Sequence, residues 1–273
     1  MNRTNPLRQM LDEARPAFGV WLQLAHPAIA EMMGLLGYDI VLIDMEHGPG
    51  SLGDAANMMR GVHRSAGAAV MVRVPAADPA FLKPLLDQGP DGVMIPMVES
   101  AEEARRAVAA CRYPPAGSRG WAAGVARASL YGLDEAYTTS TADQLVVACQ
   151  IESVRAVEDI EAICAVDGID VVFIGRNDLA ADAGHILDLD HPKVNAMVDH
   201  VLSVAKHAGR KVGTVPSAGR GWSALFRDGF DIVLPSGDIS LLREAARSEL
   251  DRFRDFRSGV DKPEEPAWRS HGY

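Results

Sequence analysis

Short apolar runs rich in β-branched residues alternate with longer amphipathic segments along almost the whole chain. The runs have the length of strands, and the segments between them show the periodicity of helices. Because the runs are nearly continuous in apolar residues, they are typical of a parallel sheet that is covered on both faces. The predicted strands are at residues 17–24, 39–45, 68–74, 92–98, 144–152, 170–175, 211–217 and 231–237.

Eight strand–helix units in about 250 residues predict an α/β fold, the (β/α)8 TIM barrel. A doubly wound open sheet is the alternative, but it usually has fewer strands and a glycine-rich turn after the first strand, where this chain has none, and no GxxxxGK[ST] motif is present. No linker divides the sequence, so we expect one domain over 1–273, with its core at about 17–250 and a proline-rich, charged tail at 251–273. Residues 113–143 form a long irregular segment, and a loop of this length is usually functional.

The charge and composition exclude several classes of partner. The net charge of −10, without a basic cluster interleaved with aromatic residues, disfavours nucleic acid. The apolar runs are far shorter than the roughly 20 residues that span a membrane, and the N-terminal segment lacks the pattern of a secretory signal. The three cysteines, Cys111, Cys149 and Cys164, have no CxxC spacing and suit core thiols in a reducing compartment. We therefore predict a cytoplasmic protein with neither membrane nor nucleic-acid partners.

Polar side chains stand at the ends of several predicted strands, where the active sites of such barrels lie. Taken singly, each has an ordinary explanation as a helix cap or a surface ion pair. Together they bring acids, a base and a fixed cation toward one face of the barrel. They are Asp44, Glu46 and His47 after the second strand, Arg73 in the third, Gln150 and Glu152 in the fifth, and Asp178 after the sixth.

The chemistry of this set favours a hard divalent cation. Carboxylates from separate strands, with no cysteine nearby, make an oxygen-rich site of the kind that Mg²⁺ or Mn²⁺ prefers. Such a metal polarises a keto group and stabilises an enolate. His47 is a suitable base near neutral pH, and Arg73 would hold a carboxylate or an oxyanion. The set fits enolate chemistry on a small 2-oxo acid.

Two rival chemistries can be weighed from the sequence. A Schiff-base aldolase needs a lysine at the carboxyl end of a strand. Only Lys211 belongs to a predicted strand, and it stands at the opposite end, so this route is nearly excluded. Phosphate binding stays open, because SAGRGWS and SGDIS after the last two strands could present backbone N–H groups, although ordinary turns explain them equally well.

Long blocks of the sequence resemble the class II, metal-dependent pyruvate aldolases, the family of 4-hydroxy-2-oxoheptanedioate and 2-keto-3-deoxy-sugar-acid aldolases. The similarity runs from about residue 17 to about 250 and includes GYDIVLIDMEHGPGS, RYPPAGSRGWAAGVARAS, QIES and GIDVVFIGRNDLAADAG. Citrate-lyase β-subunits and malyl-CoA lyases share the barrel and the paired acidic ligands, but these blocks favour the aldolases.

The resemblance implies a divalent metal, Mg²⁺, Mn²⁺ or Co²⁺, held by Glu152 and Asp178. His47 would be the base, acting on the substrate hydroxyl directly or through a water on the metal. Asp87 would sit beside that histidine and raise its basicity, reaching the site from the subunit interface. Asp44 and Glu46 would orient His47 or the waters of the metal, direct ligation by either being the less favoured alternative.

The resemblance also implies how substrate is bound and how the subunits assemble. Arg73 would stabilise the transition state by holding the pyruvyl oxygens, and Gln150 with the backbone around Asn177 and Asp178 would bind the pyruvate moiety. The chain would form a homo-oligomer, a hexamer or a trimer, whose C-terminal helices are exchanged between subunits. The expected partners are small molecules only, pyruvate and an aldehyde.

The favoured prediction is reversible cleavage of a 4-hydroxy-2-oxo acid to pyruvate and an aldehyde. The alternatives are a lyase or hydrolase acting on an acyl-CoA or a phosphorylated 2-oxo acid, and a catalytically silent barrel that only binds. Departures from the family pattern occur at Arg176, where a proline is common, at Trp121, and in the segment VPSAGRGW at 215–222. None removes a predicted catalytic group, so they put the substrate in question and not the reaction class.

Overall fold

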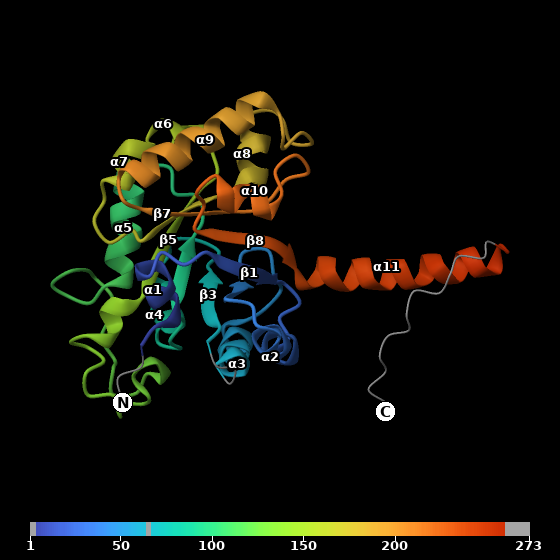
Figure 1. Cartoon of the computed structure of the whole chain (residues 1–273). Helices are drawn as coiled ribbons and strands as arrows, with labels where there is room; N and C mark the ends of the chain where they lie inside the picture. The colour runs from blue at the N-terminus through green and yellow to red at the C-terminus, as the bar shows by residue number, and fades with distance from the viewer. Residues whose placement is uncertain (1–3, 64–66, 260–273) are drawn as a thin grey trace.

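A closed barrel of eight parallel strands forms the centre of the molecule (Figure 1), which confirms the predicted fold. The computed structural model describes residues 4–63 and 67–259. Neighbouring strands follow the order of the sequence, and pairing of β1 with β8 closes the barrel. Each strand lies inside its predicted run: β1 (Ala17–Leu22), β2 (Ile40–Asp44), β3 (Ala69–Arg73), β4 (Gly92–Ile95), β5 (Val146–Ile151), β6 (Val171–Ile174), β7 (Lys211–Thr214) and β8 (Ile232–Gly237).

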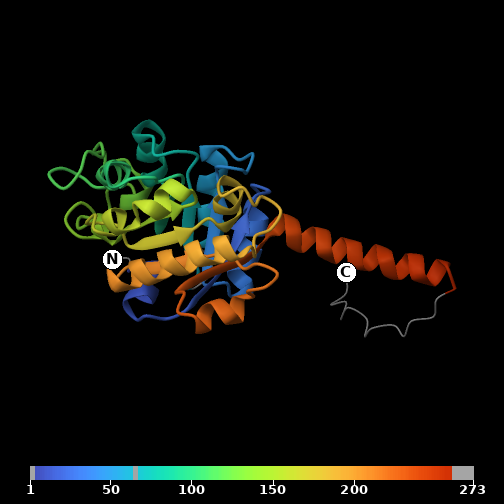
Figure 2. The same ribbon diagram turned by 90° about the horizontal axis from the view of Figure 1, so that it is seen from above.

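Helices connect the strands and cover the outside of the barrel (Figures 1 and 2). Helix α2 ends at Gly37, whose φ of 95° is the left-handed conformation that glycine adopts most readily. No helix in the described ranges is long and apolar enough to span a membrane. The helices are α1 (Pro6–Asp12), α2 (Pro27–Leu36), α3 (Leu52–Val62), α4 (Pro79–Leu86), α5 (Ala101–Cys111), η1 (Arg127–Ser129), η2 (Thr141–Gln144), α6 (Val154–Glu158), α7 (Ile160–Cys164), α8 (Arg176–Asp182), α9 (Pro192–His207), α10 (Trp222–Arg227) and α11 (Asp238–Arg257).

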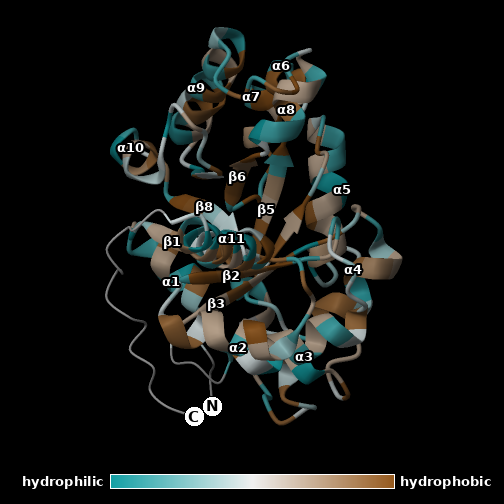
Figure 3. Ribbon diagram, turned by 90° about the vertical axis from the view of Figure 1, so that its right-hand side faces the viewer, coloured by the Kyte–Doolittle hydropathy of each residue, from teal (hydrophilic) through white to brown (hydrophobic). Residues whose placement is uncertain are grey.

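Two apolar cores hold the fold together, one between the strands and the helices and one inside the barrel. The strands are the most hydrophobic elements, and polar residues concentrate on the outer helices (Figure 3). The three cysteines are buried free thiols, as predicted. Helix α1 was not expected from the sequence. It is capped by Asn5, and it places Leu7 and Met10 among the residues of the inner core.

Helix α11 leaves the barrel and extends away from it as a single rod (Figures 1 and 2). The helix runs to Arg257 and so includes the first residues of the predicted tail at 251–273, most of which, at 260–273, lies outside the described part of the chain. Its apolar side chains have no core to enter: Leu250 is 53% exposed, Phe253 is 56% exposed and Phe256 is 76% exposed. The predicted irregular segment 113–143 is confirmed, since it contains only turns, η1 and the first residues of η2.

Candidate active site

An open cavity of roughly 430 Å³ lies at the carboxyl ends of the strands, where the site was predicted. The cavity is bounded by the ends of β1, β2, β3, β5 and β6 and by the segments that end or follow β7 and β8. It brings together predicted residues that are far apart in the sequence. The predicted side chains that line it are His47, Arg73, Gln150, Asn177 and Asp178.

Arg73 is fixed at the cavity wall by a two-pronged ion pair with Asp44. Its Nε donates to Asp44 Oδ1 at 2.9 Å and its Nη2 donates to Oδ2 at 2.7 Å. The guanidinium also stacks 4.5 Å above the ring of Trp21, and its Nη1 lies 3.1 Å from Glu46 Oε2. Burial alone would raise the pKa of Asp44, but the hydrogen bonds and charge of Arg73 hold it below its ordinary value. The guanidinium of Arg73 is therefore held in a single orientation, in which its positive charge is available to a ligand in the cavity.

Asp44 also shapes the segment that carries the predicted base. Its Oδ1 accepts hydrogen bonds from the backbone N–H of Glu46 at 3.1 Å and of His47 at 3.3 Å. Both carboxylate oxygens are therefore occupied, which fits an orienting role better than metal ligation. The side chain of His47 is exposed and faces the open cavity.

Glu152 is the buried carboxylate at the end of β5, and only one of its two oxygens accepts a hydrogen bond from the described residues. Its Oε1 accepts a hydrogen bond of 2.7 Å from the N–H of Met97, but its buried Oε2 has no partner among the described residues. Burial raises the pKa of Glu152 to about 7, the Met97 amide opposes this rise, and the charges of Glu46 and Asp178 add to it. A carboxylate with a free oxygen and acidic neighbours is poised to receive a cation.

Two backbone features bring the groups around Glu152 close together. Met97 has a φ of 51°, a strained conformation for a residue other than glycine, which is often found at functional sites. On the other side, Gly175 lets the start of α8 approach: a Cβ there would overlap Glu152 Oε2 and lie 2.7 Å from Gln150 Nε2. The first turn of α8 thereby places Asp178 near Glu152.

The oxygen atoms around Glu152 would supply part of a metal's coordination shell. Within residues 4–63 and 67–259, no group of three or more His, Cys, Asp or Glu side chains is arranged to hold a metal. Glu152 and Asp178 supply two carboxylates, and Gln150 Oε1 is a second buried oxygen without a partner in that part of the chain. Mg²⁺ and Mn²⁺ are commonly held by one or two carboxylates, with water or substrate oxygens completing the shell. The donors therefore fit a hard divalent cation that shares its coordination with a ligand.

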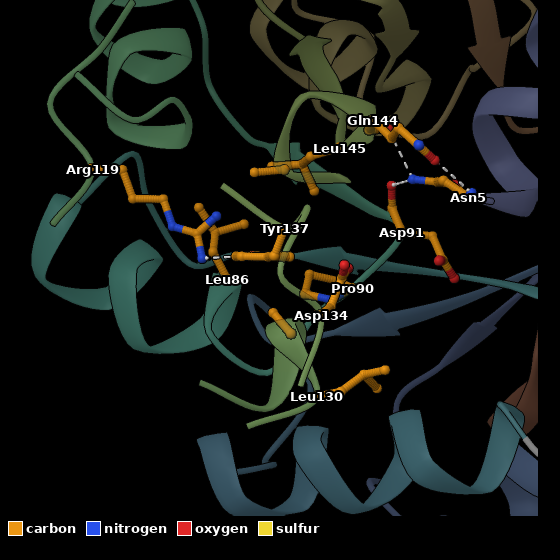
Figure 4. A pocket seen from close by; sticks show the side chains of 13 residues that line it. Asn5, Leu86, Pro90, Asp91, Arg119, Leu130, Asp134, Tyr137, Gln144 and Leu145 are labelled. Carbon is orange, nitrogen blue, oxygen red and sulfur yellow. Dashed lines mark hydrogen bonds between the residues drawn. The ribbon is translucent and has the colours of Figure 1, made fainter. Parts of the chain in front are cut away.

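Asp87 lies outside this cavity in the single chain. It caps the end of α4, and its Oδ1 accepts a hydrogen bond of 2.8 Å from Arg119 Nη2. The same nitrogen of Arg119 donates to the hydroxyl of Tyr137 at 3.2 Å (Figure 4). Contact between Asp87 and the His47 of another copy stays a prediction.

A second cavity, shown in Figure 4, lies at the opposite end of the barrel. It has a volume of about 60 Å³ and is lined by residues that precede β4 and β5, among them Asp91 and Gln144. The Asn5 side chain donates to the carbonyl oxygens of both, at 2.6 and 2.9 Å. These bonds tether α1 to the barrel, and the cavity is too small for the predicted substrates.

Three observations around the main cavity weigh against the rival chemistries. No lysine in the described part of the chain lines it, which agrees with the exclusion of an imine route. The amide of Gly219 donates to Asp190 and that of Gly237 donates to Ser240, so neither is free for a phosphate. The buried carboxylate of Asp238 occupies the first turn of α11, where an anion would otherwise bind.

Trp21, Gln23 and Phe173 are among the lining residues that the sequence analysis did not name. Trp21 and Gln23 come from β1 and the residue just beyond it, and Gln23 Nε2 donates to Asp44 Oδ2 at 3.2 Å. Phe173 of β6 packs edge-to-face on Trp21, with ring centroids 6.0 Å apart. The two-residue spacing of Trp21 and Gln23, which puts both on one face of a strand, was the available signal.

Comparison with known proteins identifies the family of the chain. The family model described as HpcH/HpaI aldolase/citrate lyase matches residues 17–245. A hydroxypyruvate/pyruvate aldolase of Chromohalobacter salexigens is 38% identical over 250 residues, covering 92% of this chain and 98% of the relative. A 5-keto-4-deoxy-D-glucarate aldolase of Citrobacter koseri is 34% identical, covering 92% of this chain and 96% of the relative.

A solved structure shares the whole barrel. The crystal structure of an HpcH/HpaI aldolase/citrate lyase family protein from Burkholderia cenocepacia has a TM-score of 0.87 and 36% identity, covering 92% of this chain and 100% of that chain. The predicted resemblance to the pyruvate aldolases is confirmed at the level of the family. The chain belongs to the HpcH/HpaI aldolase/citrate lyase family of carbon–carbon lyases.

Proposed function

We propose that the protein is a divalent-metal-dependent aldolase that reversibly cleaves a 4-hydroxy-2-oxo acid to pyruvate and an aldehyde. The observation that carries the proposal is the buried carboxylate of Glu152, whose free oxygen lies near Asp178 in a site that also contains Arg73. Without a cation, this arrangement leaves a buried acid unsatisfied. The names of the relatives from C. salexigens and C. koseri, which refer to 2-oxo acids, support this class of substrate.

Glu152 and Asp178 would hold the metal. When bound, a divalent cation acts as a Lewis acid that polarises a 2-oxo group. Hydrogen bonding by the Met97 amide fixes one oxygen of Glu152, so the other keeps its direction. Gln150 and the first turn of α8 would bind the carboxylate and keto oxygens of the pyruvyl group.

Side chains of the protein carry out the proton transfer and stabilise the charge that develops. His47 takes the proton of the C4 hydroxyl, the C3–C4 bond breaks, and the C4 carbon leaves as an aldehyde. The bonding electrons become those of the pyruvate enolate, whose negative charge is stabilised by the guanidinium of Arg73. Protonation at C3 then gives pyruvate. The ion pair with Asp44 keeps Arg73 in place throughout.

The cavity wall from β7 and β8 would receive the aldehyde portion of the substrate. Its lining side chains are small or apolar, with no acid or base among them: Val215, Pro216, Leu234, Pro235 and Ser236. A wall of this kind can bind a short aliphatic or hydroxylated chain but offers no charge to hold an anionic one.

The proposal includes a homo-oligomer, a hexamer or a trimer, in which α11 is exchanged between subunits. Support comes from the length of α11, its projection from the barrel (Figure 2) and the exposure of Phe253 and Phe256. Burying these side chains against a second copy would remove a large apolar surface from water. The oligomer would also let Asp87 reach the site of a neighbour.

Metal removal and a base variant test the proposal together. Pyruvate release from 4-hydroxy-2-oxo acids should be lost in EDTA and should return with Mg²⁺, Mn²⁺ or Co²⁺. A His47→Ala protein should lose about 10²–10⁴-fold in turnover. His200→Ala, which removes an exposed imidazole on α9, is the matched control and should keep full activity. Undiminished turnover in EDTA would exclude the metal, and an active His47→Ala protein would exclude this base.

A further inference from the structure

Arg176 is completely buried, although it lies in the first turn of α8 beside the site. Its guanidinium points toward the segment between α8 and α9. Nε donates to the carbonyl oxygen of Leu189 at 2.9 Å, and Nη2 donates to Asp190 Oδ1 at 3.2 Å and to Asn195 Oδ1. A buried arginine with three acceptors on one side restricts their positions, because movement of any one of them breaks a hydrogen bond to the buried charge.

Asp190 connects this arginine to the loop that follows β7. Its Oδ1 accepts a hydrogen bond of 2.5 Å from the hydroxyl of Ser217, and its Oδ2 accepts one of 2.8 Å from the amide of Gly219. The Ser217 hydroxyl and the Gly219 amide hold the pKa of Asp190 below its usual value. The approach is close, since a Cβ on Gly219 would lie 3.1 Å from Asp190 Cγ.

The two ends of this network continue directly into the cavity wall. On one side, Arg176 and the two residues that follow it, Asn177 and Asp178, line the cavity. On the other side, Val215 and Pro216, which precede Ser217, line it. The distance between the metal-binding turn of α8 and the wall from β7 therefore depends on how firmly Asp190 holds its partners on both sides.

We propose that Arg176 and Asp190 form a clamp that sets the width of the aldehyde side of the site, with Arg176 as a positioning residue for substrate specificity. The inference rests on the proposed aldolase function, since it assigns the wall from β7 to the aldehyde. With the clamp intact, Val215 and Pro216 lie close to the reacting carbon and favour small aldehydes. With the clamp released, the loop moves outward, and kcat/KM for larger aldehydes rises relative to kcat/KM for small ones.

Ser217→Ala and Asp190→Asn test the clamp without removing the buried arginine, whose loss could prevent folding. Ser217→Thr retains a hydroxyl and serves as the conservative variant, and Ser223→Ala on the neighbouring α10 is the matched control. Hydrogen exchange of the amides at 217–221, followed by mass spectrometry in the full-length protein, should be about tenfold faster in the first two variants and unchanged in the others.

Aldol addition of pyruvate to aldehydes of increasing size gives the second measurement. In Ser217→Ala and Asp190→Asn, the ratio of kcat/KM for a small over a large aldehyde should fall by about tenfold, since pocket shape commonly discriminates by this order. The KM for pyruvate should stay unchanged, which a general loss of structure would not allow. The ratios for Ser217→Thr and Ser223→Ala should equal that of the wild-type protein.

The outcomes separate the clamp from the reaction. Unchanged exchange in both variants would overturn the clamp, whatever the activity. Faster exchange with an unchanged ratio of aldehydes would overturn its role in specificity. If the wild-type protein formed no aldol product with any of the three metals, the proposed function and the specificity role would both fail, while the exchange data would still decide whether Asp190 holds the loop.

Discussion

Replacement of Glu152 by glutamine is expected to stabilise the metal-free protein at neutral and alkaline pH while removing its response to metal. The side chain is 3% exposed, and its pKa rises from 4.5 to about 7 in the folded state. The folded protein therefore binds more protons than the unfolded protein between these values. The contribution of Glu152 to the free energy of unfolding therefore falls as the pH rises from about 4.5 to about 7 and is constant above that range.

The magnitude follows from the shift of the pKa. A pKa that rises from 4.5 to about 7 lowers the free energy of unfolding above pH 7 by about 3 kcal/mol. Glutamine carries no charge, and its Oε1 can still accept from the Met97 amide, as Glu152 Oε1 does at 2.7 Å. The variant should therefore be more stable than the wild type at pH 8 by up to about 3 kcal/mol, and the difference should shrink toward zero near pH 4.5.

Urea unfolding in EDTA at pH values from 5 to 8 measures this difference. Glu135→Gln, which removes an exposed carboxylate, controls for the loss of one charge and should show no such trend. Adding Mn²⁺ at 100 times its Kd should stabilise the wild type by about 2.7 kcal/mol and leave Glu152→Gln unaffected. The reasoning would be refuted if Glu152→Gln were less stable than the wild type at pH 8. It would also be refuted if the difference in free energy of unfolding between the two proteins were the same at pH 5 and at pH 8.

Three further changes probe the rest of the site and the assembly. Gly175→Ala should weaken Mn²⁺ binding in calorimetry by tenfold or more, because its Cβ would overlap Glu152 Oε2, whereas Gly124→Ala, which has nothing within 4 Å, should bind normally. Arg73→Lys should lower kcat/KM for pyruvate release by about 10–100-fold without unfolding, since lysine cannot make the paired bonds to the strand-β2 aspartate. Phe253→Asp should shift the protein to a smaller species in size-exclusion chromatography, and an unchanged elution volume would exclude a role for α11 in assembly.

The barrel and much of the site could be predicted because both depend on simple periodic rules. Eight apolar runs separated by helices permit few folds, and parallel strands place their carboxyl ends at one face. His47, Arg73, Gln150 and Asp178 therefore converge, although up to 131 residues separate them. The assignment of Glu152 and Asp178 as metal ligands, which stays a proposal, came from the resemblance to a known family and not from spacing.

What the sequence did not reveal depends on contacts between distant segments. Helix α1 is short, and its place under the barrel follows only once the strands have closed around Leu7 and Met10. Arg176 stood out as a departure from a pattern, but its bonds to Asp190 and the indirect link to Ser217 require the folded loops to meet. Local secondary-structure propensity contains no information on contacts between segments that are distant in the sequence.

The two buried carboxylates of the site show how environment assigns a role to a residue type. Asp44 and Glu152 are both 3% exposed, and both stand at strand ends. Asp44 has two bonds from Arg73, so its pKa is lowered and it is ionised without outside help. Glu152 is buried beside Glu46 and Asp178, which raises its pKa, and the Met97 amide and the charge of Arg73 offset this rise only in part. The proposed roles follow this difference: Asp44, whose oxygens are both hydrogen-bonded, orients its neighbours, and Glu152, which has an oxygen without a partner among the described residues, is the proposed ligand.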